Sequence, residues 1–467
     1  MSGLFDGLEL GKKALATHQL WLNTIGHNIA NVNTPGYSRQ RVSIQASQPY
    51  ENALGPIGTG VEAFRISNIR DLFLNQQYRD DNQSLGQWTA AEKTITQIEE
   101  VFSEPSDGSL SNLLNQFWSS WSDLANNQDA DLNTLKNNLK VNANLLTSAM
   151  HRIHSQLSAI SDNVDKDIEL TVQKVNVITT EIASLNMKIS NIELGDERAN
   201  DLRDQRDYLL DELSEYVDSN AVEQSNGTVT VLIGAMTLVD QNRSFDLETY
   251  KARGNSSAVT EIVWQGTKVN INIVNGTIKG LTETRDEVIP KYLQALDDIA
   301  AALVTNVNSL HLTGYNSSGT TGTNFFDPNN RSAANIKLTD DILNESSNIA
   351  SASTPDSPGD RTIALAISDL STSKVLVGGT STINDFYQSL IGNIGSESAK
   401  AQNLKSTLEL VVAQLENSRQ SVQGVSLDEE MTQMIKFQHA YDAAARVITT
   451  MDEALNTVIN NMGLVGR

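Results

Sequence analysis

The chain has no cysteine among its 467 residues. Disulfides, thiolate metal ligands and cysteine nucleophiles are therefore excluded, and stability has to come from packing. No window approaches the roughly 20 apolar residues of a membrane span, so we expect no membrane partner. The opening MSGLFDGLELGKKALATHQL has its lysines after the first apolar residues and no continuous apolar run, so we expect no cleaved secretory signal.

Basic residues are scarce as well. The 34 Lys and Arg stand against 57 Asp and Glu, which gives a formal charge of -23. A polyanionic phosphate backbone is repelled by such a field, so nucleic acid is not an expected partner. The acidity is explained by solubility and by itself indicates no ligand.

Proline occurs only eight times, and neither the tract 106–289 nor the tail after Pro358 contains any. Long helices are therefore permitted in both tracts. From Ile168 to Ile192 apolar residues recur at alternate steps of three and four, which predicts a coiled-coil seam. Amphipathic helices are also predicted over 199–217 and over about 383–418. The length suggests roughly three domains.

The pattern changes between Ala221 and Gly280 to runs of β-branched residues. Asn226-Gly227 and Asn275-Gly276 interrupt these runs, and Asn-Gly tolerates the positive φ angles of a hairpin turn. The sequence therefore predicts a small β domain inserted into a helical chain.

Both ends of the chain have helical apolar patterns. At the far end Ser426 to Glu429 fits an S-x-x-E capping box, and no Gly or Pro interrupts Leu427 to Met462. The apolar positions of the N-terminal seam, which Gly11 and His18 complete, are Leu4, Leu8, Leu15, Leu22, Ile25 and Ile29. The principal C-terminal positions are Leu427, Met431, Met434, Tyr441, Ile448, Leu455 and Ile459.

The C-terminal apolar face is wider than one partner helix covers, because Ile435, Phe437, Val447 and Val458 extend it. The terminal helices can pair with each other and still leave apolar surface for further copies. The same pattern also fits an ordinary core helix of a large domain.

The first helix should end in the stretch NIANVNTPGYSRQRVSIQA, residues 28–46. Asn31 suits a helix end, and Pro35 and Gly36 before Tyr37 take the second and third positions of a type II turn. Afterwards Val42, Ile44 and Ala46 alternate with polar residues as in a half-buried strand. Such helix-turn-strand corners are common, so local chemistry does not assign a role.

Residues 28–40, NIANVNTPGYSRQ, resemble the N-terminal signature of the bacterial flagellar rod, hook and hook-filament junction proteins. The tail SVQGVSLDEEMTQMIKFQHAYDAAARVITTMDEAL, 421–455, resembles that of the hook-filament junction branch of this family. The segments ANDLRDQRDYLLDEL and GYNSSGTTGTNFF resemble the family's interior more loosely. The terminal matches cover about 90 residues.

This resemblance implies a mainly α fold with an inserted β domain, in an elongated multidomain chain whose two termini pair in a helical coiled-coil domain. We expect residues 1–60 plus 426–467 to form that axial domain, and 61–220 plus 286–425 a helical domain. Residues 221–285, with parts of 325–380 as an open alternative, would form the outer β domain.

The resemblance also implies a structural role in the bacterial flagellum. Copies would form a ring between hook and filament, which filament assembly requires. The implied partners are other copies, the hook protein, a second junction protein on the filament side, an export chaperone and the export apparatus. The assembly interface would consist of the terminal seam residues together with Asn31, Pro35, Gly36 and Tyr37. The protein would lie outside the cell, at the hook-filament junction, after export without a cleaved signal.

The sequence gives little support for a metal site, a cofactor site or a catalytic site. His151 and His154 lie three apart on a helical stretch but have no third ligand at a fixed spacing. The sequence from Gly58 to Ala63 fits G-x-G-x-x-A without the strand that a dinucleotide site needs before it. Trp118 and Trp121 are three apart, as in helix packing. With no nucleophile elbow or Walker motif, we expect neither catalysis nor a cofactor or metal.

Two other hypotheses stay open. A hook or rod subunit shares the opening signature but not the tail. A secreted coiled-coil adhesin would use the β insertion to bind a ligand and the helices as a stalk. Ligand binding by residues 221–285 alone would favour the adhesin, and assembly through the termini would favour the junction protein.

Overall fold

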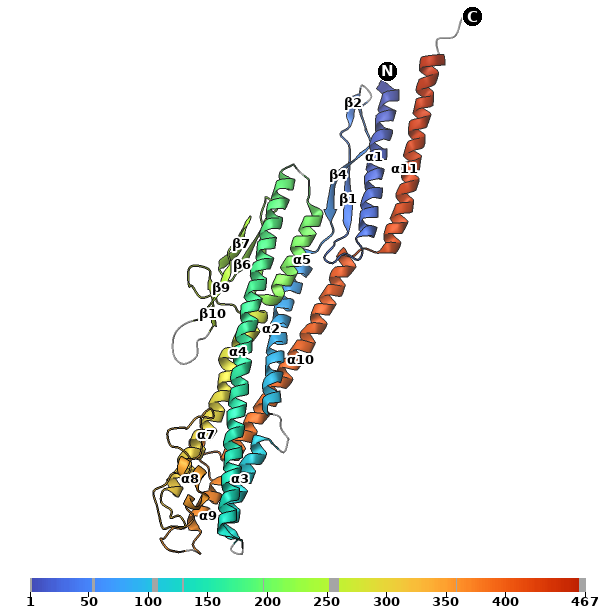
Figure 1. Ribbon diagram of the computed structural model, residues 1–467. Helices are drawn as coiled ribbons and strands as arrows, with labels where there is room; N and C mark the ends of the chain where they lie inside the picture. The colour runs from blue at the N-terminus through green and yellow to red at the C-terminus, as the bar shows by residue number, and fades with distance from the viewer. Residues whose placement is uncertain are drawn as a thin grey trace, which may run out of the picture. The chain divides into compact units, whose positions relative to one another are not determined.

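The computed structural model describes residues 2–52, 55–102, 108–127, 130–195, 197–251, 260–357 and 359–461. The described chain is mainly α-helical with a small antiparallel β region, which confirms the predicted fold class (Figure 1). Two compact units are present: residues 1–85, 172–276 and 408–467 form unit 1, and residues 86–171 and 277–407 form unit 2. Three long helices contribute residues to both units: α2 (Leu72–Phe102), α4 (Leu132–Ile192) and α10 (Ile383–Gln423).

Unit 1 contains the helices at both ends of the chain. They are α1 (Ser2–Ala30) and α11 (Leu427–Asn456), the latter followed by a π-helical turn (Thr457–Asn461). These helices pack on each other, and strands β1 (Gln40–Ala46) and β4 (Val61–Asn68) lie along α1 (Figure 1). Helix α5 (Asn200–Tyr216) follows α4 after a 3-10 turn (Glu193–Gly195). The pairing of the termini therefore brings together segments from opposite ends of the sequence.

The strands of unit 1 are all antiparallel. β1 pairs with β4, β2 with β3 and β9 with β10, and a four-stranded sheet has the order β5-β6-β7-β8. Asn226-Gly227 forms the β5–β6 turn as predicted, with Gly227 at φ +81°. The bounds are β1 (Gln40–Ala46), β2 (Tyr50–Asn52), β3 (Gly55–Ile57), β4 (Val61–Asn68), β5 (Ser219–Glu223), β6 (Val229–Ile233), β7 (Met236–Asp240), β8 (Arg243–Ser244), β9 (Leu247–Lys251) and β10 (Thr260–Trp264).

The described part of unit 2 consists of helices, turns and irregular loops. Its remaining elements are α3 (Leu110–Asn126), α6 (Thr277–Glu283), a π-helical turn η2 (Thr284–Val288), α7 (Ile289–His311), α8 (Asp340–Asn344), α9 (Thr362–Ser368) and 3-10 turns at Ser346–Asn348 and Asp369–Ser371. Trp118 and Trp121 are buried in its core as the helix-packing prediction required, and Trp121 contacts Phe325 and His311.

Two local expectations were wrong. Asn275-Gly276 does not form a hairpin, because α6 begins directly after it and Gly276, at φ +91°, lies against the backbone of Tyr216. Ile44 and Ala46 are not on a half-buried face: both are exposed, Ile44 at 53%. The β1–β4 register shifts between Ser43 and Ile44, so Phe64 is an extra residue and the alternation of β1 is broken there.

None of the described helices is long and apolar enough to span a bilayer. The described residues also contain no group of three or more His, Asp or Glu side chains placed to hold a metal ion.

Candidate assembly interface at the chain termini

The end of α1 is shaped by its own sequence. The Asn31 side chain donates to the His27 carbonyl at 3.0 Å, and Thr34 donates to Asn31 Oδ1 at 3.1 Å. The Tyr37 N–H donates to the Thr34 carbonyl at 3.2 Å, and Gly36 has φ +73°. These two features are those of the predicted type II turn. Asn31 and Tyr37 are half-buried, whereas Pro35 and Gly36 are exposed.

Asn28 organises the chain that follows this turn. Its Nδ2 donates to the Gln40 carbonyl and to Glu430 Oε2, both at 3.0 Å. Its Oδ1 accepts the Gln40 N–H at 2.9 Å and the Tyr37 hydroxyl at 2.8 Å. The amide thereby makes four hydrogen bonds. Asn28 can therefore be buried, at 1% exposure, with no polar atom of its side chain left unpaired.

Glu430 on α11 is the partner that joins the two ends of the chain. It is 2% exposed, and its Oε1 accepts from Arg39 Nε at 2.6 Å. Arg39 Nη1 also reaches Glu429 at 2.7 Å, and the Arg39 N–H donates to the Gln423 carbonyl at 2.9 Å. Ser426 precedes α11 as predicted, but its side chain makes no capping bond. The predicted capping box is therefore wrong in its hydrogen bonds, because Glu429 pairs with Arg39.

Helix α5 holds the same loop from the other side. Asp204 is 3% exposed, accepts the Ser38 N–H at 2.8 Å and lies 3.0 Å from Arg70 Nη2. Burial raises the pKa of Asp204 to about 6, against the opposing effect of Arg70. Burial, reinforced by Asp201 and Asp204, also raises the pKa of Tyr37, so its hydroxyl stays a neutral donor.

Helices α1 and α11 run antiparallel, with Asn28 near Glu430 and Gly7 near Met451. Trp21 stacks on Phe437 with ring centroids 4.4 Å apart, and His18 lies 6.0 Å from the same ring. A Cβ on Gly11 would come within 2.8 Å of Ile448. The contact face of α1 therefore contains Gly7, Gly11, His18, Trp21 and Asn28.

The contacts of α1 differ from the predicted seam at three positions. Gly11 and His18 lie on the expected face, but the other contacts with α11 come from positions 7, 21 and 28, next to the expected 8, 22 and 29. Phe437, expected beside the seam, is in it. The G-x-x-x-G spacing of Gly7 and Gly11 is the sequence signal that could have indicated this close approach.

The predicted interface residues thus fall into three groups. Ile25 is buried, and the side chain of Leu4 lies outside the described residues. The half-buried ones are Leu8, Leu15, Leu22, Ile29, Met434, Tyr441, Ile448 and Leu455. Those whose side chains are largely exposed are Leu427, Met431 and Ile459.

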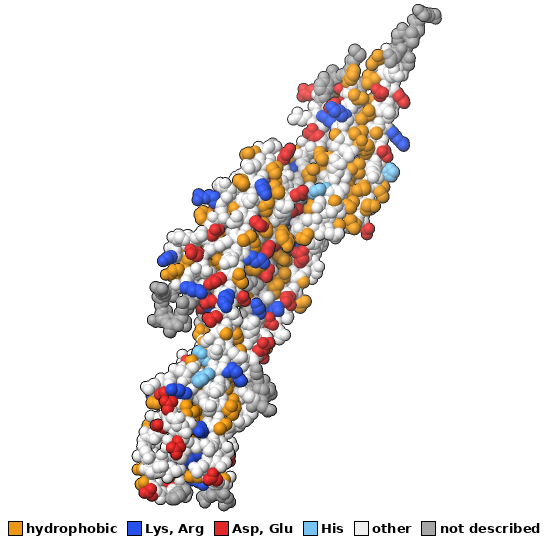
Figure 2. Space-filling model, in the orientation of Figure 1, with side chains coloured by type: hydrophobic (Ala, Val, Ile, Leu, Met, Phe, Trp, Pro, Cys, Tyr) orange, Lys and Arg blue, Asp and Glu red, His pale blue; other side chains and the backbone are white. Residues whose placement is uncertain are grey.

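The exposed apolar side chains gather beside the seam. Leu427, Met431 and Ile435 are 48%, 52% and 53% exposed. Figure 2 shows hydrophobic side chains along α1 and α11 on the face in view. On α1, positions 8, 15 and 22 lie roughly opposite Thr17 and Thr24, the buried threonines on the strand side of the helix. We define the apolar flank as Leu8, Leu15, Leu22, Leu427, Met431 and Ile435.

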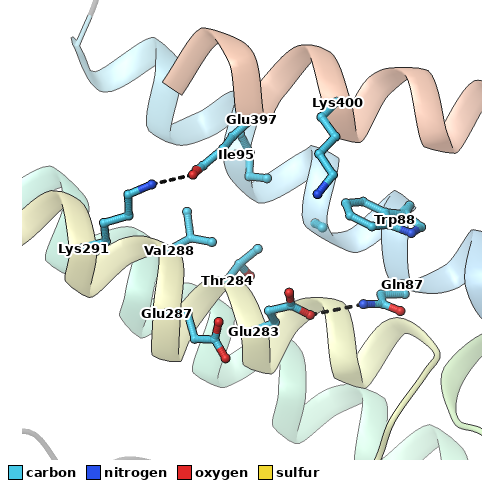
Figure 3. A pocket seen from close by; sticks show the side chains of 11 residues that line it. Gln87, Trp88, Ile95, Glu283, Thr284, Glu287, Val288, Lys291, Glu397 and Lys400 are labelled. Carbon is cyan, nitrogen blue, oxygen red and sulfur yellow. Dashed lines mark hydrogen bonds and ion pairs between the residues drawn. The ribbon is translucent and has the colours of Figure 1, made fainter. Parts of the chain in front are cut away.

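Unit 2 contains a hollow between its helices (Figure 3). It has a volume of about 290 Å³, with Trp88, Ile95 and Val288 among its apolar lining residues. Both oxygens of Glu397 at its rim are bonded, to Lys291 and to the Tyr292 hydroxyl, each at 2.6 Å. No Ser or His lines it, so the lining residues supply no nucleophile with an imidazole base.

Three family descriptions match parts of the chain. Residues 95–326 match the helical domain of the flagellar hook-associated protein FlgK. Residues 8–37 match the flagella basal body rod protein, and 418–462 match the C-terminal part of the flagellar basal body rod FlgEFG proteins. The last two matches contain the paired termini and the Asn28–Glu430 contact. These three matches, on a chain with this fold, define a structural protein of the bacterial flagellum.

Curated relatives are similar over the whole length. Flagellar hook-associated protein 1 of Bacillus subtilis is 32% identical over 509 aligned residues that cover 100% of both chains. That of Escherichia coli is 25% identical over 98% of this chain and 100% of its own. The chain belongs to the flagellar hook-associated protein 1 family. The structure of the flagellar hook junction protein FlgK from Burkholderia pseudomallei shares the fold, with a TM-score of 0.67, 16% identity, and coverage of 74% of this chain and 100% of that one.

Proposed function

We propose that this chain is a structural, non-enzymatic subunit of the junction between hook and filament. Copies form a ring through the apolar flank of the paired termini, and filament assembly depends on that ring. Full-length similarity to hook-associated protein 1 supports the location. The exposed apolar flank is the observation that carries the ring, because apolar patches of this kind mark protein contacts.

The paired termini support an axial position in this assembly. The seam is already closed within one chain by Trp21, Phe437 and the Asn28–Glu430 bond, so the flank is the side left for other copies. The division into an axial domain, a helical domain and an outer β domain, with the boundaries given above, belongs to the same proposal. The charge of -23 makes repulsion between copies a cost that apolar contact has to exceed.

The further partners follow from this location. The hook protein lies on one side and a second junction protein on the other. An export chaperone and the flagellar export apparatus deliver the chain outside the cell without cleavage of a signal. Membership of a flagellar structural family supports these assignments.

The first test is electron microscopy of cells that lack the gene, with an assay for filament protein in the medium. Bare hooks with filament subunits lost to the medium are expected. Loss of the hooks themselves would move the chain to a hook or rod role. Normal filaments would contradict the junction role altogether.

The second test separates flank from seam by complementing these cells with variants. Met431→Asp places a charge on the exposed flank, so we expect a folded monomer that fails to restore filaments. Thr432→Asp is the matched control: Thr432 is exposed, and helical spacing puts it on the side of α11 away from α1. Leu22→Asp and Leu455→Asp test the half-buried positions. If Met431→Asp, Leu22→Asp and Leu455→Asp all restored filaments, the proposed interface would be contradicted.

A further inference from the structure

The inserted β region has a hollow of about 450 Å³ where its two small sheets meet. Met236 and Thr237 of β7 and Ser244 of β8 line one side, and Trp264 at the end of β10 lines the other. The remaining lining residues are Phe245, Asp246, Gln265, Thr267 and Val269. This volume falls within the range of about 300–1,000 Å³ for small-molecule sites.

The walls of this hollow are held in place by backbone hydrogen bonds. The Phe245 N–H donates to the Leu238 carbonyl at 2.9 Å, and the Gln265 N–H donates to the Asp246 carbonyl at 3.0 Å. The Trp264 N–H donates to the Val269 carbonyl at 3.1 Å and so closes the turn that forms the rim. The site is therefore formed before any ligand arrives.

Two polar groups of the lining residues lack a strong hydrogen-bond partner. Asp246 Oδ1 is buried and accepts no hydrogen bond from any described residue. Trp264 Nε1 donates only to the thioether of Met236, at 2.9 Å, and a thioether is a weak acceptor. Burying a carboxylate oxygen without a donor is unfavourable, so a ligand hydroxyl in the hollow would satisfy the Asp246 carboxylate once its side chain turns toward the ligand.

Apolar groups complete the lining. Phe245, Met236 and Val269 are 40%, 43% and 49% exposed, so they offer contact area at the surface. Cations already flank the hollow. Arg243 lies 5.8 Å from the centroid of the Phe245 ring, and Lys268, in the turn between Thr267 and Val269, has its Nζ 4.8 Å from the centroid of the Tyr250 ring. A cationic ligand would be repelled by these two side chains, which leaves a neutral polar ligand as the better fit.

We propose that this hollow binds a monosaccharide unit of a glycan. Vicinal ring hydroxyls donate to Asp246, the C–H face of the pyranose ring packs on Phe245 and Val269, and Gln265 and Thr267 at the rim contact the outer hydroxyls. A pyranose ring combines an apolar face with paired hydroxyls and so matches both the apolar and the acceptor side of the hollow. This binding is independent of assembly through the termini.

The test is saturation-transfer NMR of the full-length protein with the methyl glycosides of glucose, galactose, mannose and N-acetylglucosamine. At least one glycoside should show transfer. Asp246→Asn and Phe245→Ala should each weaken the affinity for that glycoside roughly tenfold. The first variant loses a hydrogen bond to a charged group, and the second loses an aromatic contact. Phe64→Ala is the control: it removes an exposed aromatic side chain from β4 outside the hollow and should leave transfer unchanged.

A second readout does not depend on the variants. With ¹³C-labelled methionine methyl groups, the glycoside should shift the Met236 resonance and leave those of the other seven methionines in place. Three results would each overturn the proposal. They are no transfer for any glycoside, transfer in Asp246→Asn and Phe245→Ala equal to that in the wild type, and tighter binding of butylammonium than of any glycoside. Filament formation by the Asp246 variant is expected to be normal.

Discussion

At the scale of single residues, a few polar contacts hold the two ends of the chain together. Asn28, Arg39 and Glu430 come from segments about 400 residues apart, and their side chains satisfy one another in a buried site. In such a site the removal of one partner leaves the other without compensation. We therefore expect the loss of stability on substitution here to depend on which of these partners is removed.

Glu430 and its neighbour Glu429 offer a matched comparison. Glu430→Ala should cost about 3 kcal/mol of the stability of the terminal helix pair, because it removes the acceptor of a buried Asn28 N–H and of Arg39 Nε. Glu429→Ala removes a carboxylate that is 63% exposed and should cost at most about 1 kcal/mol. The loss of stability in each variant is measured by urea unfolding, with hydrogen exchange of the α1 and α11 amides as the readout. Equal losses would show that the buried position is not special.

Gly36 and Gly26 offer a second comparison. Gly36→Ala should destabilise unit 1 by about 2 kcal/mol, because φ is +73° and a Cβ would lie 2.8 Å from Tyr208 Cβ. Gly26→Ala, inside α1 with open space around it, should instead stabilise by about 0.5–1 kcal/mol. Thermal unfolding of the two variants distinguishes them. The same sign for both would contradict the conformational argument.

His311 predicts a pH dependence in unit 2. It is fully buried, its Nδ1–H donates to the Thr323 carbonyl at 2.7 Å, and its Nε2 accepts the Ala350 N–H at 2.9 Å. These bonds require the neutral ring, and burial lowers its pKa to about 4 from 6.5. The unfolded chain therefore binds a proton near pH 6.5 that the folded chain does not. Stability should fall by up to about 3 kcal/mol between pH 6.5 and pH 4.

Because carboxylates also titrate in this range, the measurement is a difference between variants. Urea unfolding from pH 7 to pH 4 should show a steeper loss for the wild type than for His311→Asn. His439→Asn, which replaces an exposed histidine, should follow the wild type. Parallel curves for the wild type and His311→Asn would contradict the assignment.

At the scale of secondary-structure elements, α1 and α11 use different faces for different contacts. The seam is closed within the chain by Trp21 and Phe437, while Ile435 lies on the exposed flank. Large-to-small substitutions should therefore loosen the pair only when they fall in the seam.

Phe437→Ala should destabilise the α1–α11 pair by about 3 kcal/mol, since it removes a stacked ring. Ile435→Ala should change the stability of the monomer by less than about 0.5 kcal/mol, because its side chain is largely exposed. Hydrogen exchange of the α1 amides reports the difference. An effect of Ile435→Ala as large as that of Phe437→Ala would place Ile435 in the seam.

At the scale of the whole molecule, order should vary along the paired termini of the monomer. Polar contacts are concentrated where Asn28 and Arg39 meet Glu430, whereas the contact of Gly7 with Met451 is apolar only. Along α11, hydrogen exchange in a verified monomer should be slowest near Glu430 and fastest near Asn456, and assembly should slow it throughout. Uniform protection along α11 in the monomer would contradict this gradient, which follows from local opening at sites with few buried contacts.

The sequence by itself determined the local features of this protein and its family. Helix ends at Asn31 and Ser426, the type II turn at Pro35-Gly36 and the hairpin at Asn226-Gly227 depend on neighbouring residues, so composition and spacing predict them. Tertiary structure alone decided the pairing register of α1 and α11, the exposure of Ile44 and the role of Glu430. The physical reason is that periodicity shows which side chains share a face, but not which face a partner from 402 residues away will choose. That choice came from close approach at Gly7 and Gly11 and from hydrogen bonds that only the folded chain can form.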